Sequence, residues 1–304
     1  MILGINGIIA SGTVTPLLLD TYSGSVGAFS LRKLRTAYTG SAIRVRRSSD
    51  NTSLDIGFIN NQLDTTSLLS FVGSGDGFVS IWYDQTGSGF NFSQNTSSLQ
   101  PKIVSSGVLL TKNSKPTILF DGTSNYMNVP SSQNYYGFLH KTGQSYVSIV
   151  GYSRIQKVAY LLCNNNAGSA NFGYTISVET NKNINVFVTK GSPGFPVIDN
   201  LSTNTPLTTD SLYLITNHND TANSTASLRS SIYFNNNSAI SNNTRTNSPS
   251  TSDASWPLYL GSSNQAPLAN YFDGGMSEII IYNSNQSANR TGISTNINSY
   301  YSIY

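Results

Sequence analysis

The sequence is short of charged residues. Asp, Glu, Lys and Arg make up 10% of its 304 residues, whereas an ordinary soluble domain has about 25%. The net charge of +3, from 17 basic and 14 acidic side chains, is too small for the concentrated basic surface that nucleic acid requires. Cys163 is the one cysteine, which excludes an intrachain disulfide. No run approaches the ~20 apolar residues of a membrane-spanning helix, so we predict neither a nucleic-acid partner nor a membrane span.

Asn, Ser, Thr, Gly and Tyr take the place of the missing charge. These residues favour strands and turns and are poor helix formers. Their amide, hydroxyl and aromatic groups also suit the recognition of sugars. The start, MILGINGIIASG, has no basic segment before its apolar residues and is a poor secretory signal. With the lack of disulfides, this favours a protein made in a bacterial cytoplasm and then displayed on the outside of a particle.

Short segments of alternating apolar and polar residues fill the chain, above all from residue 115 to the C-terminus. At near-regular spacing they are typical of an antiparallel sandwich or barrel, not of a parallel α/β sheet. Two earlier strands are predicted at 41–49 and 77–83. One face of the second strand is expected to carry Val79, Ile81 and Tyr83.

Two short surface helices are predicted. The segment 27–40 has Leu31, Leu34 and Tyr38 at helical spacing and is closed by Gly40. The segment 64–73 begins with Asp64 as a candidate N-cap and ends at Gly73.

Five motifs in the C-terminal two thirds carry a resemblance to laminin G-like and concanavalin A-like domains. They are PTILFDGTSNYMNVP, SYVSIVGYSR, SLRSSIYFNNN, PLYLGSS and YFDGGMSEIIIYN, and QSANRTGISTNINSYY after them resembles the family's final short helix and strand. The resemblance covers residues 115–304. It implies an all-β, concanavalin A-like jelly-roll sandwich of two antiparallel sheets.

The N-terminal part resembles a different family. LLLDTYSGSVGAFSLRKLRTAYTGSAIRVRRSSDN, IGF and IWYDQTGSGFNFSQ resemble the start of the catalytic domain of fungal-type α-L-arabinofuranosidase B. Similar segments, joined to laminin G-like halves, occur in tail-type and structural proteins of bacteriophages, the group to which this chain looks closest. The resemblance implies one continuous sandwich over 17–304, preceded by an arm over 1–16 that could instead be its first strand.

The joined resemblance implies a bacteriophage virion protein of a tail, fibre or capsid decoration, and not an enzyme. It would bind host-surface glycan or neighbouring virion subunits and form a homo-oligomer at the virion surface. A purely architectural subunit is a further interpretation, in which the arm inserts into a neighbour by strand addition. The arm residues expected to carry that assembly are Ile2, Leu3, Ile5, Ile8 and Ile9.

The alternative is a glycoside hydrolase resembling α-L-arabinofuranosidase. Such enzymes usually need two carboxyl groups about 5–10 Å apart. The chain has two glutamates, and Glu278 lies where the laminin G-like pattern has a structural residue. Glu179 is therefore the one plausible nucleophile, with Asp84 as a candidate second carboxylate.

Loop residues supply the candidate binding sites. Asp84 and Gln85 in YDQTGSG could hold a sugar, although Asp84 could instead cap the turn and Gln85 bond to backbone. Candidate aromatic platforms for a sugar are Tyr135, Tyr136 and Trp256. Calcium is the one cofactor considered, and its candidate ligands are Asp121, Asn125 and Asp273.

The basic strand Ile43–Arg47 has two interpretations. It could grip an acidic polysaccharide or a neighbouring subunit. Alternatively, its arginines pair with nearby carboxylates, for which the candidates are Asp50, Asp55 and Asp64.

Overall fold

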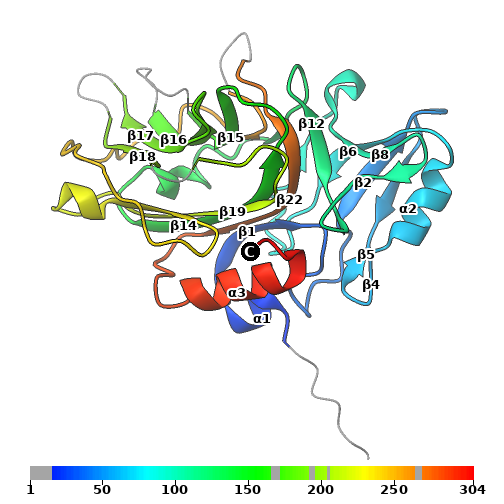
Figure 1. Ribbon diagram of the computed structural model, residues 1–304, viewed down its shortest axis with the longest axis horizontal. Helices are drawn as coiled ribbons and strands as arrows, with labels where there is room; N and C mark the ends of the chain where they lie inside the picture. Colours follow the sequence, from blue (N-terminus) through cyan, green and yellow to red (C-terminus); the bar gives the residue numbers. More distant parts are fainter. Residues whose placement is uncertain (1–15, 166–171, 192–195, 204–205, 264–268) are drawn as a thin grey trace, which may run out of the picture.

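The computed structural model describes residues 16–165, 172–191, 196–203, 206–263 and 269–304. In these ranges the chain forms one continuous antiparallel sheet of 18 strands, folded into two layers, with three short helices (Figure 1). The predicted all-β sandwich is confirmed. The expected arm over 1–16 and its assembly residues Ile2, Leu3, Ile5, Ile8 and Ile9 lie outside the described residues, apart from Pro16.

The back layer is centred on β22, which lies between β14 on one side and two shorter strands, β1 and β12, on the other. β19 and β20 extend the layer beyond β14. The strands are β1 (Ser25–Ser30), β12 (Ile118–Asp121), β14 (Gln144–Ser153), β19 (Tyr213–Asp220), β20 (Ser230–Phe234) and β22 (Asp273–Tyr282).

The front layer runs in the order β18-β17-β16-β15-β21-β13-β7. Its strands are β7 (Phe92–Ser93), β13 (Met127–Val129), β15 (Ala159–Cys163), β16 (Phe172–Val178), β17 (Ile184–Lys190), β18 (Ile198–Leu201) and β21 (Leu258–Leu260).

The two layers join at β6, which pairs with β7 of the front layer and also with β8, and β8 in turn pairs with β12 of the back layer and with β9. The strands of this junction are β2 (Ile43–Arg47), β3 (Ser53–Ile56), β6 (Gly77–Trp82), β8 (Lys102–Ser105) and β9 (Val108–Leu109). Two small hairpins stand apart, formed by β4 (Phe58–Ile59) with β5 (Gln62–Leu63) and by β10 (Thr111–Lys112) with β11 (Lys115–Pro116).

Two apolar clusters hold the layers in place. The main core between the layers includes Phe29, Trp82, Phe120 and Tyr174, all fully buried. A second cluster lies on the outer side of the back layer, where it is covered by α1 (Leu18–Thr21) and α3 (Arg290–Tyr301) (Figure 1). The outer face of the back layer is therefore covered where α1 and α3 pack, whereas Leu119 of β12 lies at the edge of this cover and is only half-buried.

One of the two predicted helices is confirmed and the other is wrong. α2 (Thr65–Val72) begins after Asp64, whose carboxylate accepts the N–H of Ser67, and ends at Gly73. The segment 27–40 instead contains β1 and an irregular turn.

The reason for the error is that Leu31 and Leu34 do not share one face. Leu31 packs into the main core, whereas Leu34 packs into the outer cluster. The helix-like spacing of these residues therefore arises because an extended segment contributes one leucine to each of the two apolar clusters.

No described helix is both long and apolar enough to cross a membrane.

The expectation that Val79, Ile81 and Tyr83 lie on one face of strand 77–83 is also wrong. Val79 and Trp82 are fully buried, whereas Ile81 is only half-buried. The pairing of β2 with β6 shifts by one residue, since Arg44 faces Ile81 but Val45 faces Val79. Ser80 is thus an extra, bulged residue that turns Trp82 inward.

Candidate functional site

A row of side chains crosses the outer face of the front layer. In register order it runs through Asn128, Tyr259, Cys163, Thr175 and Phe187. Directly paired residues project from the same face of a sheet, and their neighbours Met127, Leu260 and Ile176 belong to the core beneath. Most of the row is polar or tyrosine, so this face differs chemically from the apolar outer face of the back layer.

The polar side chains of β16 continue along this face. Thr175 and Ser177 alternate with core residues, and Glu179 follows at the end of the strand. The Ser177 hydroxyl donates to Glu179 Oε1 at 2.8 Å, which places the two side chains together. Asn185 of β17 pairs with Ser177 across the ladder and adds an amide to the group. We call Thr175, Ser177, Glu179 and Asn185 the β16 polar cluster.

Two atoms of the β16 polar cluster have no hydrogen-bond partner within the described ranges. They are Thr175 Oγ1 and Asn185 Oδ1, and both are buried. A buried polar atom without a partner destabilises a fold by about 1–3 kcal/mol. Such atoms suit a ligand that brings hydroxyl groups of its own.

Tyr160 borders the β16 polar cluster. It pairs with Ser177 in the ladder, and its N–H donates to the carbonyl of Asn270 at 3.0 Å. Tyr160 is 6% exposed, so the sheet beside the β16 polar cluster is not open to solvent at this position.

Three tyrosines form a strip on the same face, which we call the tyrosine strip. Tyr126 and Tyr259 stack with ring centroids 5.7 Å apart and an interplanar angle of 20°. Burial, and then the neighbouring Tyr126, raise the pKa of both Tyr259 and Tyr271. The three half-buried rings therefore lie close together, next to Cys163 of the cross-strand row.

Asp121 and Asp273, two of the proposed calcium ligands, face each other across β12 and β22. Asp121 Oδ1 accepts the backbone N–H groups of Thr123, Ser124 and Asn125 at 2.8–2.9 Å. Burial by itself raises the pKa of Asp121, but these donors outweigh it and hold the pKa well below its usual range.

The calcium prediction does not fit these donors. Asp273 forms an ion pair with Arg154 at 2.5 Å, and the oxygens of Asp121 are taken up by its own turn. No cluster of three or more His, Cys, Asp or Glu side chains suited to a metal occurs in the part of the chain that the structure describes. Calcium prefers six to eight free oxygen ligands, and these residues do not offer them.

Asp84 holds a loop to β1. Its Oδ1 accepts the N–H of Ala28 at 2.7 Å, and its Oδ2 accepts the hydroxyl of Ser88 at 2.6 Å and that of Thr86. The side chain is buried and follows β6, whereas Glu179 follows β16. The structure therefore records no contact between these two candidate catalytic carboxylates, and the contacts of Asp84 are those of a turn-capping residue.

Gln85 is likewise occupied by the backbone. Its Oε1 accepts the N–H of Leu34 at 2.8 Å, and its Nε2 donates to the carbonyls of Arg32 and Ser30 at 2.9 and 3.1 Å. The residue is fully buried. A role in binding sugar would require these bonds to be given up, and it stays a prediction.

The proposed aromatic platforms are placed differently from one another. Tyr136 is fully buried in the main core, so its ring cannot stack on a sugar in this structure. Tyr135 stacks on Phe90 at 3.9 Å and donates its hydroxyl to the carbonyl of Val26. Trp256 is half-buried, and its indole nitrogen has no partner in the described ranges.

The sequence alone did not identify Thr175, Ser177, Asn185 or the tyrosine strip as site residues. The available signal was the alternation in YTISVE, which puts Thr175, Ser177 and Glu179 on one face. Asn185 and Tyr259 come next to them only through strand pairing.

Comparison with known proteins places the fold. No model of a protein family and no curated protein matches the sequence. Among solved structures, a mutant GH54 α-L-arabinofuranosidase soaked with 4-nitrophenyl α-L-arabinofuranoside matches 92% of this chain with a TM-score of 0.63 and 14% identity. The same coverage is found for a GH54 α-L-arabinofuranosidase soaked with a cyclic sulfate inhibitor (TM-score 0.58, 14% identity) and for an arabinofuranosidase complexed with arabinofuranosyl-α-1,2-xylobiose (TM-score 0.58, 12% identity).

These matches correct the functional interpretation. The expectation of a bacteriophage virion protein without enzymatic activity is wrong, because the structures that share this fold over almost the whole chain are glycosidases and include complexes with substrates or inhibitors. This chain spans 64% of the length of each of these three proteins. It has an arabinofuranosidase-like β-sandwich fold.

Proposed function

We propose that the chain is a glycoside hydrolase whose saccharide lies over the β16 polar cluster and whose nucleophile is Glu179. The observation that carries the proposal is the position of Glu179. It is a carboxylate on the outer face of the front layer, held by Ser177 and next to buried polar atoms without partners. Similarity of fold to arabinofuranosidases over 92% of the chain supports the same reading.

The chemistry assigned to Glu179 is that of a retaining glycosidase. Its carboxylate attacks the anomeric carbon, and the glycosidic C–O bond breaks with its electron pair on the leaving oxygen, which takes a proton from a second carboxyl group. Water then attacks the glycosyl ester, gives a proton back to that second group and restores the carboxylate of Glu179. The hydroxyl of Ser177 holds Oε1 in place by donating a hydrogen bond to it.

Binding of the sugar is assigned to the neutral members of the β16 polar cluster. Thr175 Oγ1 and Asn185 Oδ1 can each accept a hydrogen bond from a sugar hydroxyl. The half-buried tyrosine strip offers aromatic faces for the C–H side of the ring. A substrate without a hydroxyl at the matching position would leave these atoms unpaired and bind more weakly.

The test is hydrolysis of a panel of 4-nitrophenyl glycosides that includes the α-L-arabinofuranoside. We expect Glu179→Gln to lower kcat/KM by about 10²–10⁴-fold, and Ser177→Ala to lower it less. Asp253→Asn is the matched control, because Asp253 is an exposed partner of Lys141 and lies outside the cluster.

Two outcomes would overturn the proposal. One is a wild-type protein that cleaves no member of the panel, and the other is a Glu179→Gln variant as active as the wild type. In an active protein, Asp199→Asn would test Asp199 as the proton donor by an altered pH profile, since Asp199 Oδ1 lies 3.5 Å from the Asn185 amide nitrogen of the cluster.

A further inference from the structure

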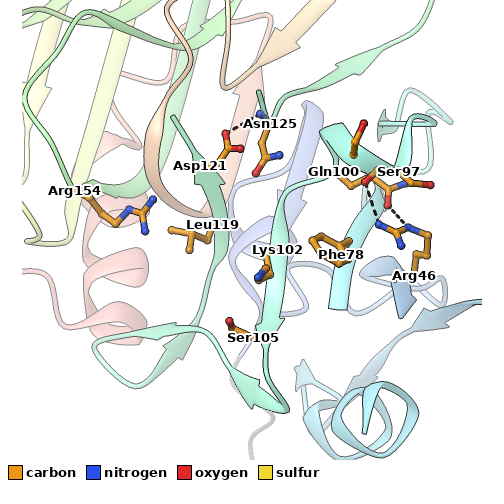
Figure 2. A pocket seen from close by; sticks show the side chains of 11 residues that line it. Arg46, Phe78, Ser97, Gln100, Lys102, Ser105, Leu119, Asp121, Asn125 and Arg154 are labelled. Atoms are coloured by element: carbon orange, nitrogen blue, oxygen red, sulfur yellow. Dashed lines mark hydrogen bonds between the residues drawn. The ribbon is translucent and has the colours of Figure 1, made fainter. Parts of the chain in front are cut away.

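A cleft of about 720 Å³ opens at the junction of the two layers, away from the β16 polar cluster. Its floor is a cross-strand row that runs from Leu119 of β12 through Lys102 and Phe78 to Arg46 of β2. Figure 2 shows Asp121, Asn125 and Arg154 at one end of the cleft and Arg46, Gln100 and Ser97 at the other.

Arg46 is the unusual group of this cleft. Its guanidinium donates to three neutral acceptors, Gln100 Oε1 and Asn51 Oδ1 at 2.7 Å and the carbonyl of Ser97 at 3.0 Å. No described carboxylate pairs with it. A guanidinium has five N–H groups, so two remain for a ligand.

Other cations of the cleft already have counter-ions. Lys102 pairs with Asp76 at 2.8 Å, and Arg154 pairs with Asp273. Arg44, two residues from Arg46 on the same strand, is held by Asp55 through two bonds of 2.8 Å. The arginines of the basic strand therefore differ in their ion pairs. Arg44 pairs with Asp55 and Arg47 pairs with Asp50, whereas Arg46 pairs with no described carboxylate.

Burial makes the missing counter-ion of Arg46 matter. Desolvation lowers the pKa of Arg46, the direction expected for a charge removed from water without an anion. The ring of Phe78 holds the group in place, with Arg46 Cζ 4.6 Å and Lys102 Nζ 5.5 Å from its centroid. An anion at this end of the cleft would meet Arg46, the cation for which no described carboxylate is a partner, since Lys102 is already paired with Asp76.

The rest of the lining fits a sugar ring. Leu119, with the edge of the Phe78 ring beside it, gives an apolar floor for the C–H face of a pyranose. Asn125 is 8% exposed, and its side-chain amide has no recorded hydrogen bond within the described ranges. Ser97, Ser98 and Ser105 add hydroxyls at the rim.

We propose that this cleft binds a saccharide carrying a carboxylate, a uronic acid residue, with the carboxylate on the two free N–H groups of Arg46 and the ring towards Leu119. This binding is independent of the proposed hydrolysis, since none of its residues belongs to the β16 polar cluster.

Calorimetric titration of the Glu179→Gln protein tests the proposal. The probes are trigalacturonic acid, its methyl ester, which has the same rings without charge, and inorganic phosphate. We expect the acid to bind at least about tenfold more tightly than the ester, and the affinity to fall with added salt. Arg46→Gln should weaken binding of the acid about tenfold or more, whereas Arg44→Gln should leave it unchanged.

Three results would overturn it: equal binding of acid and ester, no binding of either, or competition by phosphate at the same concentration as the acid. Thermal midpoints of both arginine variants show whether each is folded. Should Arg46→Gln unfold, Arg46→Lys keeps the charge but loses the planar donor pair, and it must still weaken binding of the acid. Because hydrolysis is already disabled in the background protein, a negative result here leaves the hydrolase proposal untouched.

Discussion

At the scale of single residues, one buried ion pair joins β1 to β22 and to α3. Arg32 Nε and Nη2 donate to the two oxygens of Glu278 at 2.7 and 2.9 Å, and Ser30 donates to the same carboxylate at 2.7 Å. The side chain of Glu278 is 1% exposed. Removal of one partner would leave a buried charge without compensation.

We therefore expect Arg32→Met to lower the free energy of unfolding by about 3–5 kcal/mol. The measurement is urea unfolding at neutral pH. Arg44→Met is the matched comparison, because its pair with Asp55 is more than a third exposed on both sides, and its loss should cost at most about 1 kcal/mol. Equal losses in the two variants would contradict the account of the buried pair.

His140 gives the protein a defined sensitivity to acid. Desolvation by burial lowers the pKa of His140 to about 4, although its contact with the Ser252 carbonyl acts in the opposite direction. In the unfolded chain the imidazole of His140 takes up a proton near pH 6.5, whereas in the folded protein it does so only near pH 4. The unfolded state therefore binds more protons in this window, and stability falls as pH falls from about 6.5 to about 4.

The expected loss from His140 is about 3 kcal/mol across that window. Unfolding free energies of wild type and His140→Gln should be measured at several pH values, and the difference between the two slopes isolates His140. This subtraction is needed because burial also lowers the pKa of His218. Parallel slopes in the two proteins would show that His140 is not the group responsible.

At the scale of elements, α2 depends on its first residue. Asp64 accepts the N–H of Ser67 at 3.0 Å, and the helix buries Leu68 and Val72. We expect Asp64→Ala to destabilise the protein by about 1 kcal/mol, and Asp64→Asn to retain most of the cap. Thermal unfolding of the two variants measures this, and equal effects would mean that the charge and not the cap is important.

The sequence predicted local features well wherever one face of an element meets one core. Ile43 and Val45 alternate with arginines in β2, and both are buried as expected. Prediction failed where the position of a residue in the sequence does not determine which face of the element its side chain lies on. Ser80 shifts the register of β6, and Leu31 and Leu34 serve different clusters.

The candidate site shows the same limit of sequence reading. Glu179 could be chosen from the sequence because it is one of two glutamates. Its neighbour Asn185 and the more distant Tyr259 join it only through the ladder β21-β15-β16-β17. Neither pairing has a local signature in the sequence. The hydrogen-bond partners of Arg46 likewise depend on tertiary structure, because Ser97 and Gln100 come from a distant loop.

At the scale of the whole molecule, the continuous sheet predicts a single unfolding transition. β6 pairs with strands of both layers, and Trp82 at its end packs in the main core. In a Trp256→Phe variant, Trp82 is the only tryptophan and reports the junction, while circular dichroism reports all strands. We expect the two signals to share one urea midpoint, and two separate midpoints would show that the part around β6 and the remaining sandwich are distinct domains.

The pairing of β1 with β22 also governs how the chain can fold during synthesis. Ser30 and Glu278 are register partners although 248 positions separate them. As the polypeptide leaves the ribosome, β1 has no neighbour along that edge until nearly all of the remaining chain has emerged. Nascent β1 must therefore wait for its strand partner, although Trp82 and Phe92 can already cover Phe29, and slow closure of the sheet follows from this contact between distant segments.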